Sequence, residues 1–245
     1  MRTGDLEIWL NHFEHHALHG RCVPHDLSDV LKPDERALIA SSIATFQLGE
    51  ESEGRTLLRA AERFAQDQQV PHLLRIVELI VREEQRHAGL LRAFMQDHLI
   101  PLKRTNWTDR IFRLIRRLAG LRLYVSVLIC AELIGNAYYR ALEKVTDCER
   151  LQVLCRTIVS EELAHVGFES QLLFTPRAGR PAEWWDLARS AHRMFFASTA
   201  TVVWFTHRPV LRRAGHGRRS FLRSCLAQYK FYLEPIPRSD ALIAA

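Results

Sequence analysis

Two copies of the pattern Glu-x-x-His constrain this 245-residue chain more than any other feature. They occupy positions 84–87 and 162–165, and a second glutamate, Glu83 or Glu161, precedes each of them. Residues three positions apart lie on the same face of a helix, so each pattern presents a carboxylate next to an imidazole. What these pairs do depends on whether that face is buried.

Four glutamates lie on largely apolar stripes when side chains are placed about 100° apart around a helix. They are Glu50, Glu84, Glu132 and Glu162, and the stripe around Glu132 is the least purely apolar of the four. An unpaired carboxylate on a buried face costs several kcal/mol, so it must be neutralised, paired or bound to a metal ion.

Two interpretations of these residues are open. Ordinary buried ion pairs, or charges on solvated helix surfaces, account well for a single Glu-x-x-His. A metal site accounts better for two such patterns together with two more glutamates on apolar faces. Two divalent cations would neutralise the four carboxylates, and oxygen and imidazole ligands without a thiolate suit iron or manganese better than a structural zinc.

The order Glu, Glu-x-x-His, Glu, Glu-x-x-His on successive helices, over residues 35 to about 172, resembles the ferritin-like superfamily of non-haem di-iron carboxylate proteins. This superfamily includes ferritins, rubrerythrins and oxygen-activating hydroxylases. The resemblance implies an all-α fold, namely a ferritin-like four-helix bundle with a long crossover between its second and third helices. It also implies two iron ions, with a manganese–iron or manganese pair as the alternative metals. The implied ligands are bridging Glu84 and Glu162, terminal Glu50 and Glu132, and one imidazole for each iron from His87 and His165.

The ligand from the first helix has an alternative. The apolar stripe centres on Glu50, while Glu53 lies about 60° and Glu51 about 100° away from it. We expect Glu50 to bind the metal, with Glu53 as the alternative ligand.

Further residues share the faces that carry the expected ligands. Tyr139 lies two turns after Glu132. Three interpretations of it are open: a hydrogen-bond donor to the site, a redox-active tyrosine, or a plain core tyrosine. Glu169 and Cys155 lie on the stripe of Glu162 and are candidates for contact with the ligands.

Prolines, glycines and apolar periodicity predict one domain over residues 1–245. It divides into a core bundle (34–173), an N-terminal extension (1–33) and a C-terminal helical extension (182–233). The expected helices cover residues 33–66, 71–98, 106–118, 123–145, 146–173, 182–207 and 219–233.

Composition excludes several classes of site. The five cysteines are widely spaced and form no Cys-x-x-Cys, so neither a zinc knuckle nor a rubredoxin-type iron centre is expected. Five histidines lie between His12 and His25, and without a carboxylate at suitable spacing we interpret them as surface residues rather than as a second metal site. The uncharged run 194–206 is shorter than the about 20 residues that span a bilayer. We therefore expect no transmembrane segment and a reducing, cytoplasmic setting.

The net charge of +6 is concentrated in two basic segments, 103–122 and 208–223. They are either solvated surfaces or docking sites for an acidic protein or an anionic substrate. Nucleic acid is disfavoured because few aromatic residues interleave with the basic ones.

The resemblance implies chemistry with O2 or peroxide. The expected function is an O2-dependent oxidoreductase, a hydroxylase or oxidase, that acts on an unidentified organic substrate with an unknown electron donor. An acidic protein that docks on the basic segments is one candidate donor. The alternatives are a rubrerythrin-like peroxide scavenger and a ferritin-like protein that oxidises or stores iron. A homodimer is the default oligomeric state.

Overall fold

The computed structural model describes residues 3–20, 23–24, 27–51, 54–104, 120–174 and 182–234, and the regular structure in these ranges is entirely helical. The all-α prediction is therefore confirmed. The expected crossover helix at 106–118 and the alternative ligand Glu53 lie outside the described residues. The helices are α1 (Thr3–His19), α2 (Pro33–Glu50), α3 (Arg55–Gln68), α4 (Leu73–Asp97), α6 (Leu121–Lys144), α7 (Glu149–Phe174), α8 (Ala182–Thr206), α9 (Arg208–Arg213) and α10 (Arg218–Leu233).

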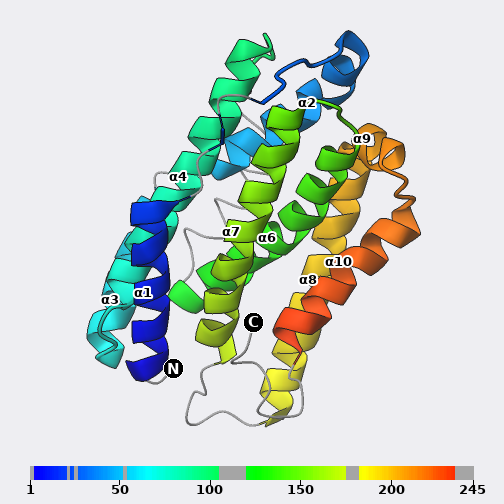
Figure 1. The fold of residues 1–245 in the computed structure, drawn as a ribbon. Helices are drawn as coiled ribbons and strands as arrows, with labels where there is room; N and C mark the ends of the chain where they lie inside the picture. The colour runs from blue at the N-terminus through cyan, green and yellow to red at the C-terminus, as the bar shows by residue number, and fades with distance from the viewer. Residues whose placement is uncertain are drawn as a thin grey trace.

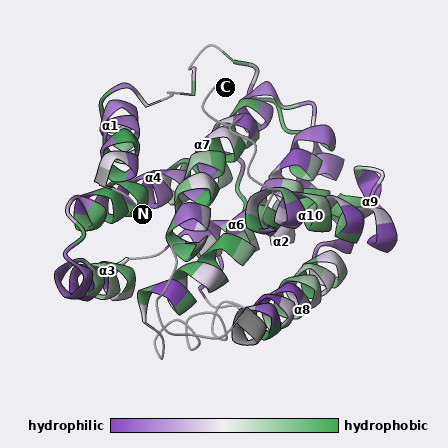
Figure 2. Cartoon of the chain, turned by 90° about the horizontal axis from the view of Figure 1, so that it is seen from below, coloured by the Kyte–Doolittle hydropathy of each residue, from purple (hydrophilic) through white to green (hydrophobic). Residues whose placement is uncertain are grey.

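Helices α6 and α7 form the most extensive pair, and α4 packs between this pair and the N-terminal helices (Figure 1). Helices α1, α2 and α3 contact α4, whereas α8, α9 and α10 contact α6, and α2 also contacts α9. Figure 2 shows α1 and α3 on one side of the molecule and α8 and α9 on the other. Four residues connect α6 to α7, and such a short connection makes the two helices antiparallel neighbours.

The helix expected over 33–66 is in fact two helices, α2 and α3. The break has a local cause at Gly54, whose backbone is left-handed with φ of 65°. A residue with a Cβ is strained in this conformation, and a Cβ at Gly54 would lie 2.4 Å from Cγ1 of Val81. Helix α2 ends at Glu50, and Gly54 then precedes α3, where the missing Cβ lets the start of α3 lie close to α4. The prediction was wrong because helical periodicity continues through the break.

The buried apolar residues form two clusters, one at each end of the long helices. On α4 the residues up to Val81 belong to one cluster, and those from Leu91 onward belong to the other. On α7 the same change occurs between Val166 and Phe168. The two Glu-x-x-His patterns lie at or near this change, so polar residues occupy a layer between two apolar cores.

Among the described residues, α6 is the one helix long and apolar enough to cross a membrane by length and composition. In its most apolar stretch, 72% of the residues are buried inside the protein. This degree of burial is typical of the central helix of a helical core.

Replacement of Gly54 by alanine should destabilise the protein by about 2 kcal/mol, because the left-handed backbone and the contact with Val81 both oppose a Cβ. The change is measured as the free energy of unfolding in urea. Gly49→Ala is the matched control, since no atom lies within 4 Å of its Cβ position in α2, and alanine there should be neutral or stabilising by up to about 1 kcal/mol. Equal effects at both positions would contradict this account of the break.

Candidate metal centre

The structure brings the six expected ligands into two groups of four. In each group the potential ligand atoms lie within 4.8 Å of one another. Glu84 and Glu162 belong to both groups, which is the arrangement that bridging carboxylates require. The first group is Glu50, Glu84, His87 and Glu162, and the second is Glu84, Glu132, Glu162 and His165.

Four helices supply these side chains. Glu50 is the last residue of α2, the Glu-x-x-His pairs lie in the middle of α4 and of α7, and Glu132 lies in the middle of α6. The sequence folds this way locally because each ligand is flanked along its helix by apolar residues that pack into the two cores. Each group therefore combines side chains from different helices.

The site is largely buried, with Glu50 and Glu84 partly exposed, and it is rich in unpaired polar atoms. His87 and His165 are fully buried, and Glu132 and Glu162 are buried as well. Both carboxylate oxygens of Glu132 and of Glu162 lack a hydrogen-bond partner in the described structure. Unsatisfied polar atoms of this kind are rare in folded proteins because each costs free energy. A bound cation would satisfy them, so these residues fit a metal centre.

Each of the two imidazoles is oriented by a glutamate from the other helix that carries a Glu-Glu-x-x-His pattern. Nε2 of His87 on α4 lies 2.6 Å from Oε2 of Glu161 on α7. Nε2 of His165 on α7 lies 2.9 Å from Oε2 of Glu83 on α4. The glutamate before each Glu-x-x-His thus binds the histidine of the other copy. The doubled Glu-Glu-x-x-His pattern contained this signal, but the sequence did not reveal the pairing between helices.

This exchange leaves Nδ1 of each imidazole facing the carboxylates. Nδ1 of His87 lies 3.1 Å from Oε1 of Glu162, and Nδ1 of His165 lies 3.0 Å from Oε1 of Glu84. Neither contact has the geometry of a hydrogen bond. A histidine that binds a metal typically has its other ring nitrogen hydrogen-bonded to a carboxylate, which fixes the ring. Nδ1 is therefore the expected metal-binding atom in both residues.

Arg86 and His16 contact the glutamates that orient the two imidazoles. The guanidinium of Arg86 donates to Oε2 of Glu161 at 2.5 Å and to Oε1 of Glu83 at 3.3 Å. Nδ1 of His16, on α1, lies 3.2 Å from Oε1 of Glu83. The prediction that the N-terminal histidines lie on the surface is thus wrong for His16. Since His16 lies 67 positions before Glu83 in the sequence, no helical spacing rule could have predicted this contact.

The other candidates from the sequence fall into two classes. The hydroxyl of Tyr139 donates to Oε1 of Glu50 at 2.7 Å, so this tyrosine is a hydrogen-bond donor to an expected ligand. Glu169 is buried close enough to Glu132 to raise the pKa of that carboxyl. The charges nearest to Cys155 belong instead to residues outside the ligand set, so this thiol is part of the apolar core.

In the absence of a metal ion, bound protons offset the negative charge of the clustered carboxylates. Burial raises the pKa of Glu50 and of Glu132 well above the usual carboxyl value, and neighbouring carboxylates raise it further. Burial acts to lower the pKa of His87, but the hydrogen bond to Glu161 and the neighbouring charge of Glu162 outweigh it and raise this pKa to about 10. Without a cation, protons take the place of metal charge.

A separate group of potential ligands, Asp29, His98 and Cys148, lies near the start of α7. Here the carboxylate of Asp29 already accepts from Arg150 at 2.6 Å and faces His98 at 2.8 Å. This group is therefore a satisfied ion-pair cluster, in contrast to the unpaired atoms of the central site.

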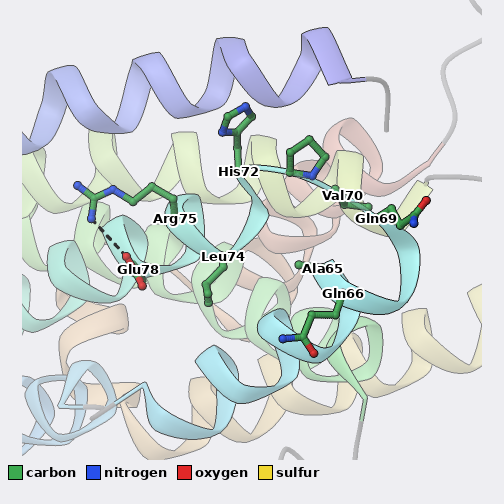
Figure 3. Close-up of a pocket in the computed structure, with 9 residues that line it drawn as sticks. Ala65, Gln66, Gln69, Val70, His72, Leu74, Arg75 and Glu78 are labelled. Carbon is green, nitrogen blue, oxygen red and sulfur yellow. Dashed lines mark hydrogen bonds and ion pairs between the residues drawn. The ribbon is translucent and has the colours of Figure 1, made fainter.

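A surface depression of about 780 Å³ lies at the turn between α3 and α4 (Figure 3). Its lining includes His72, Arg75 and Glu78, and Arg75 pairs with Glu78 one turn further along α4. None of the six expected ligands lines this depression, so it is separate from the metal-binding groups.

Comparisons of the chain with protein-family models, with curated proteins and with solved structures found no match. The assignment of the site consequently rests on the residues and their geometry.

Metal binding should release protons, because His87 with a pKa of about 10 is protonated at pH 7 and must lose a proton before it binds a cation. Titration of the metal-free protein with Mn²⁺ in weak buffer should release at least one proton from each of the two histidines. Affinity should therefore increase from pH 6 to pH 9. Affinity that is independent of pH over this range would contradict the assignment of the imidazoles as ligands.

Glu161 and Glu83, which each orient one imidazole, should affect the affinity of different metal ions. Glu161→Gln should weaken the ion bound by His87, and Glu83→Gln the ion bound by His165, each by about 10–100-fold. Two-step binding isotherms with Mn²⁺ measure both affinities. Glu78→Gln, earlier on α4, is the matched control and should leave both steps unchanged. An equal loss in both steps for each variant would show that the effect is not local.

Proposed function

We propose that this chain is a non-haem di-iron protein with a ferritin-like core, and that it is an O2-dependent oxidoreductase. The observation that carries the proposal is the pair of four-residue groups that share Glu84 and Glu162. Four carboxylates and two imidazoles with no thiolate match the preferences of iron or manganese. Two divalent ions balance the four carboxylate charges in a buried site.

When bound, a pair of ferrous ions supplies electrons for the reduction of O2 or peroxide. The chain itself contributes a dry setting, since both histidines and two of the glutamates are shielded from solvent. Exclusion of water strengthens the electrostatic interactions within the site. The same burial makes the site suitable for oxidising chemistry that water would interrupt.

Tyr139 and Asn136 of α6 lie near the site and are available for proton transfer and for binding. The hydroxyl of Tyr139 holds Glu50 through a hydrogen bond, and burial together with the charge of Glu50 raises the pKa of Tyr139, so the phenol stays protonated. Asn136, one helical turn after Glu132, is fully buried with both side-chain heteroatoms unpaired. Its amide offers a donor and an acceptor to a small bound molecule.

An electron donor must reach this centre from outside. Six arginines are exposed on α9, α10 and their connections, at positions 208, 212, 213, 218, 219 and 223. A cluster of one charge sign favours association with a partner of the opposite sign. We propose an acidic protein as the electron donor.

The ligand assignment is tested by anaerobic titration of the metal-free protein with Fe²⁺, which should saturate at about two ions for each chain. His165→Ala and Glu162→Ala should lose this binding and stay helical, whereas Glu143→Ala on α6 should bind normally. A His165→Ala protein that still takes up two ions would overturn the proposed centre.

Addition of O2 to the loaded protein separates the candidate functions. Rapid ferric absorption at a fixed two ions supports an oxidoreductase. Continued oxidation of many ions for each chain indicates iron storage instead. Oxidation by peroxide but not by O2 indicates a peroxide scavenger.

A further inference from the structure

Helix α8 carries large apolar side chains on its outer face. Leu187, Met194 and Phe205 are 69%, 72% and 55% exposed, respectively. Single exposed apolar residues are ordinary on protein surfaces, but a row of them along one helix indicates an interaction site. Figure 2 shows α8 at the outer edge of the molecule, on the side opposite α1 and α3.

These residues belong to a regular pattern, here named the α8 seam. Its six members alternate steps of four and three residues, which is the spacing of the contact positions in a coiled coil. The seam extends over 19 residues, or about 27 Å of helix. Its members are Leu187, Ala191, Met194, Ser198, Thr201 and Phe205.

The seam and the positions beside it carry no charge. The flanking residues are Ala188, Ser190, Phe195, Ala197, Val202 and Trp204. The two arginines within this stretch, Arg189 and Arg193, lie on other faces and pair with Asp186 and Glu234. In the described part of the chain, residues 187–233 contain no acid and nine basic residues, so an uncharged face 27 Å long is unexpected for a solvated helix.

The pattern is complementary to itself when two copies run antiparallel. Around a two-fold axis at the level of position 196, Met194 faces Ser198 of the second copy, and Ala191 faces Thr201. At each end Leu187 faces Phe205. A large residue thus meets a small one at the centre, and apolar residues close the ends. A two-fold interface requires this kind of self-complementarity, whereas binding to an unrelated partner does not.

We propose that the α8 seam is a dimer interface, in which α8 pairs antiparallel with α8 of a second copy of this chain. Because the flanking positions carry no charge, two copies of this basic chain can approach along the seam without repulsion between like charges at these positions. A single helix pair buries less than the about 1,600 Å² of a standard interface, so we expect dimers that dissociate at micromolar concentrations. The inference rests on α8 alone and is independent of metal binding.

Sedimentation velocity of the full chain over a range of concentrations tests the interface. The unsubstituted chain should form dimers, and Met194→Asp should weaken dimerisation by at least tenfold, because it places two carboxylates in the centre of the seam. Leu18→Asp is the matched control, since Leu18 on α1 is also exposed and lies outside the seam. Circular dichroism confirms that both variants stay helical. A monomeric unsubstituted chain, or equal weakening by both variants, would overturn the proposal.

Disulfide crosslinking tests the direction of pairing. A mixture of Ala191→Cys and Thr201→Cys chains should give the mixed 191–201 crosslink under mild oxidation, identified by mass spectrometry. Parallel pairing would instead join position 191 to itself and would contradict the antiparallel arrangement. The unsubstituted chain is the control for crosslinks through its own cysteines, of which those at 130, 148, 155 and 225 are buried and Cys22 lies outside the described residues.

Other occupants of the seam give different results. If the chain stays monomeric and co-sediments with anionic vesicles in a manner that requires Met194, the seam is a lipid-binding face and the proposal is wrong. If removal of residues 235–245 is needed before dimers form, the seam is covered by that segment in the full chain, and the proposal is again wrong.

Discussion

The burial of four carboxylates at the centre of a helical core is the constraint on which the rest of this structure depends. Each carboxylate removed from water needs a counter-charge or a proton, and an unpaired buried charge destabilises a fold by several kcal/mol. The protein places them in one layer between two apolar clusters, where Glu84 and Glu162 serve both groups. Shared ligands reduce the number of charges that must be buried for two cations.

The reciprocal exchange of Glu83 and Glu161 joins α4 to α7 across this layer. Each Glu-Glu-x-x-His pattern contributes a ligand pair to the site and an orienting carboxylate to the opposite histidine, so neither helix can shift along its axis without loss of both contacts. His16 and Arg86 contact the outer oxygen of Glu83, Oε1, and Arg86 also donates to Oε2 of Glu161, the oxygen that His87 contacts. The N-terminal helix α1 is therefore part of the support for the metal-binding groups.

The all-α class and the six side chains that the structure brings into two groups could be predicted from the sequence because they are local properties. Periodicity places Glu84 and His87 on one face, and Pro33 begins α2 as expected. The division of the first helix into α2 and α3 could not be predicted in this way. It depends on Gly54 and on the close approach of Val81, a contact between helices that local periodicity does not encode.

The sequence by itself determined which side chains must find a counter-charge, since carboxylates on apolar helical faces are costly in any tertiary arrangement. Only the tertiary structure decided which helices meet at the site. It placed Glu161 against His87, Tyr139 against Glu50 and His16 against Glu83. These pairs are separated by 74, 89 and 67 positions, respectively. The physical reason is that helical spacing orders neighbours only within a few turns, whereas contacts between helices follow from how the apolar faces of the whole chain pack together.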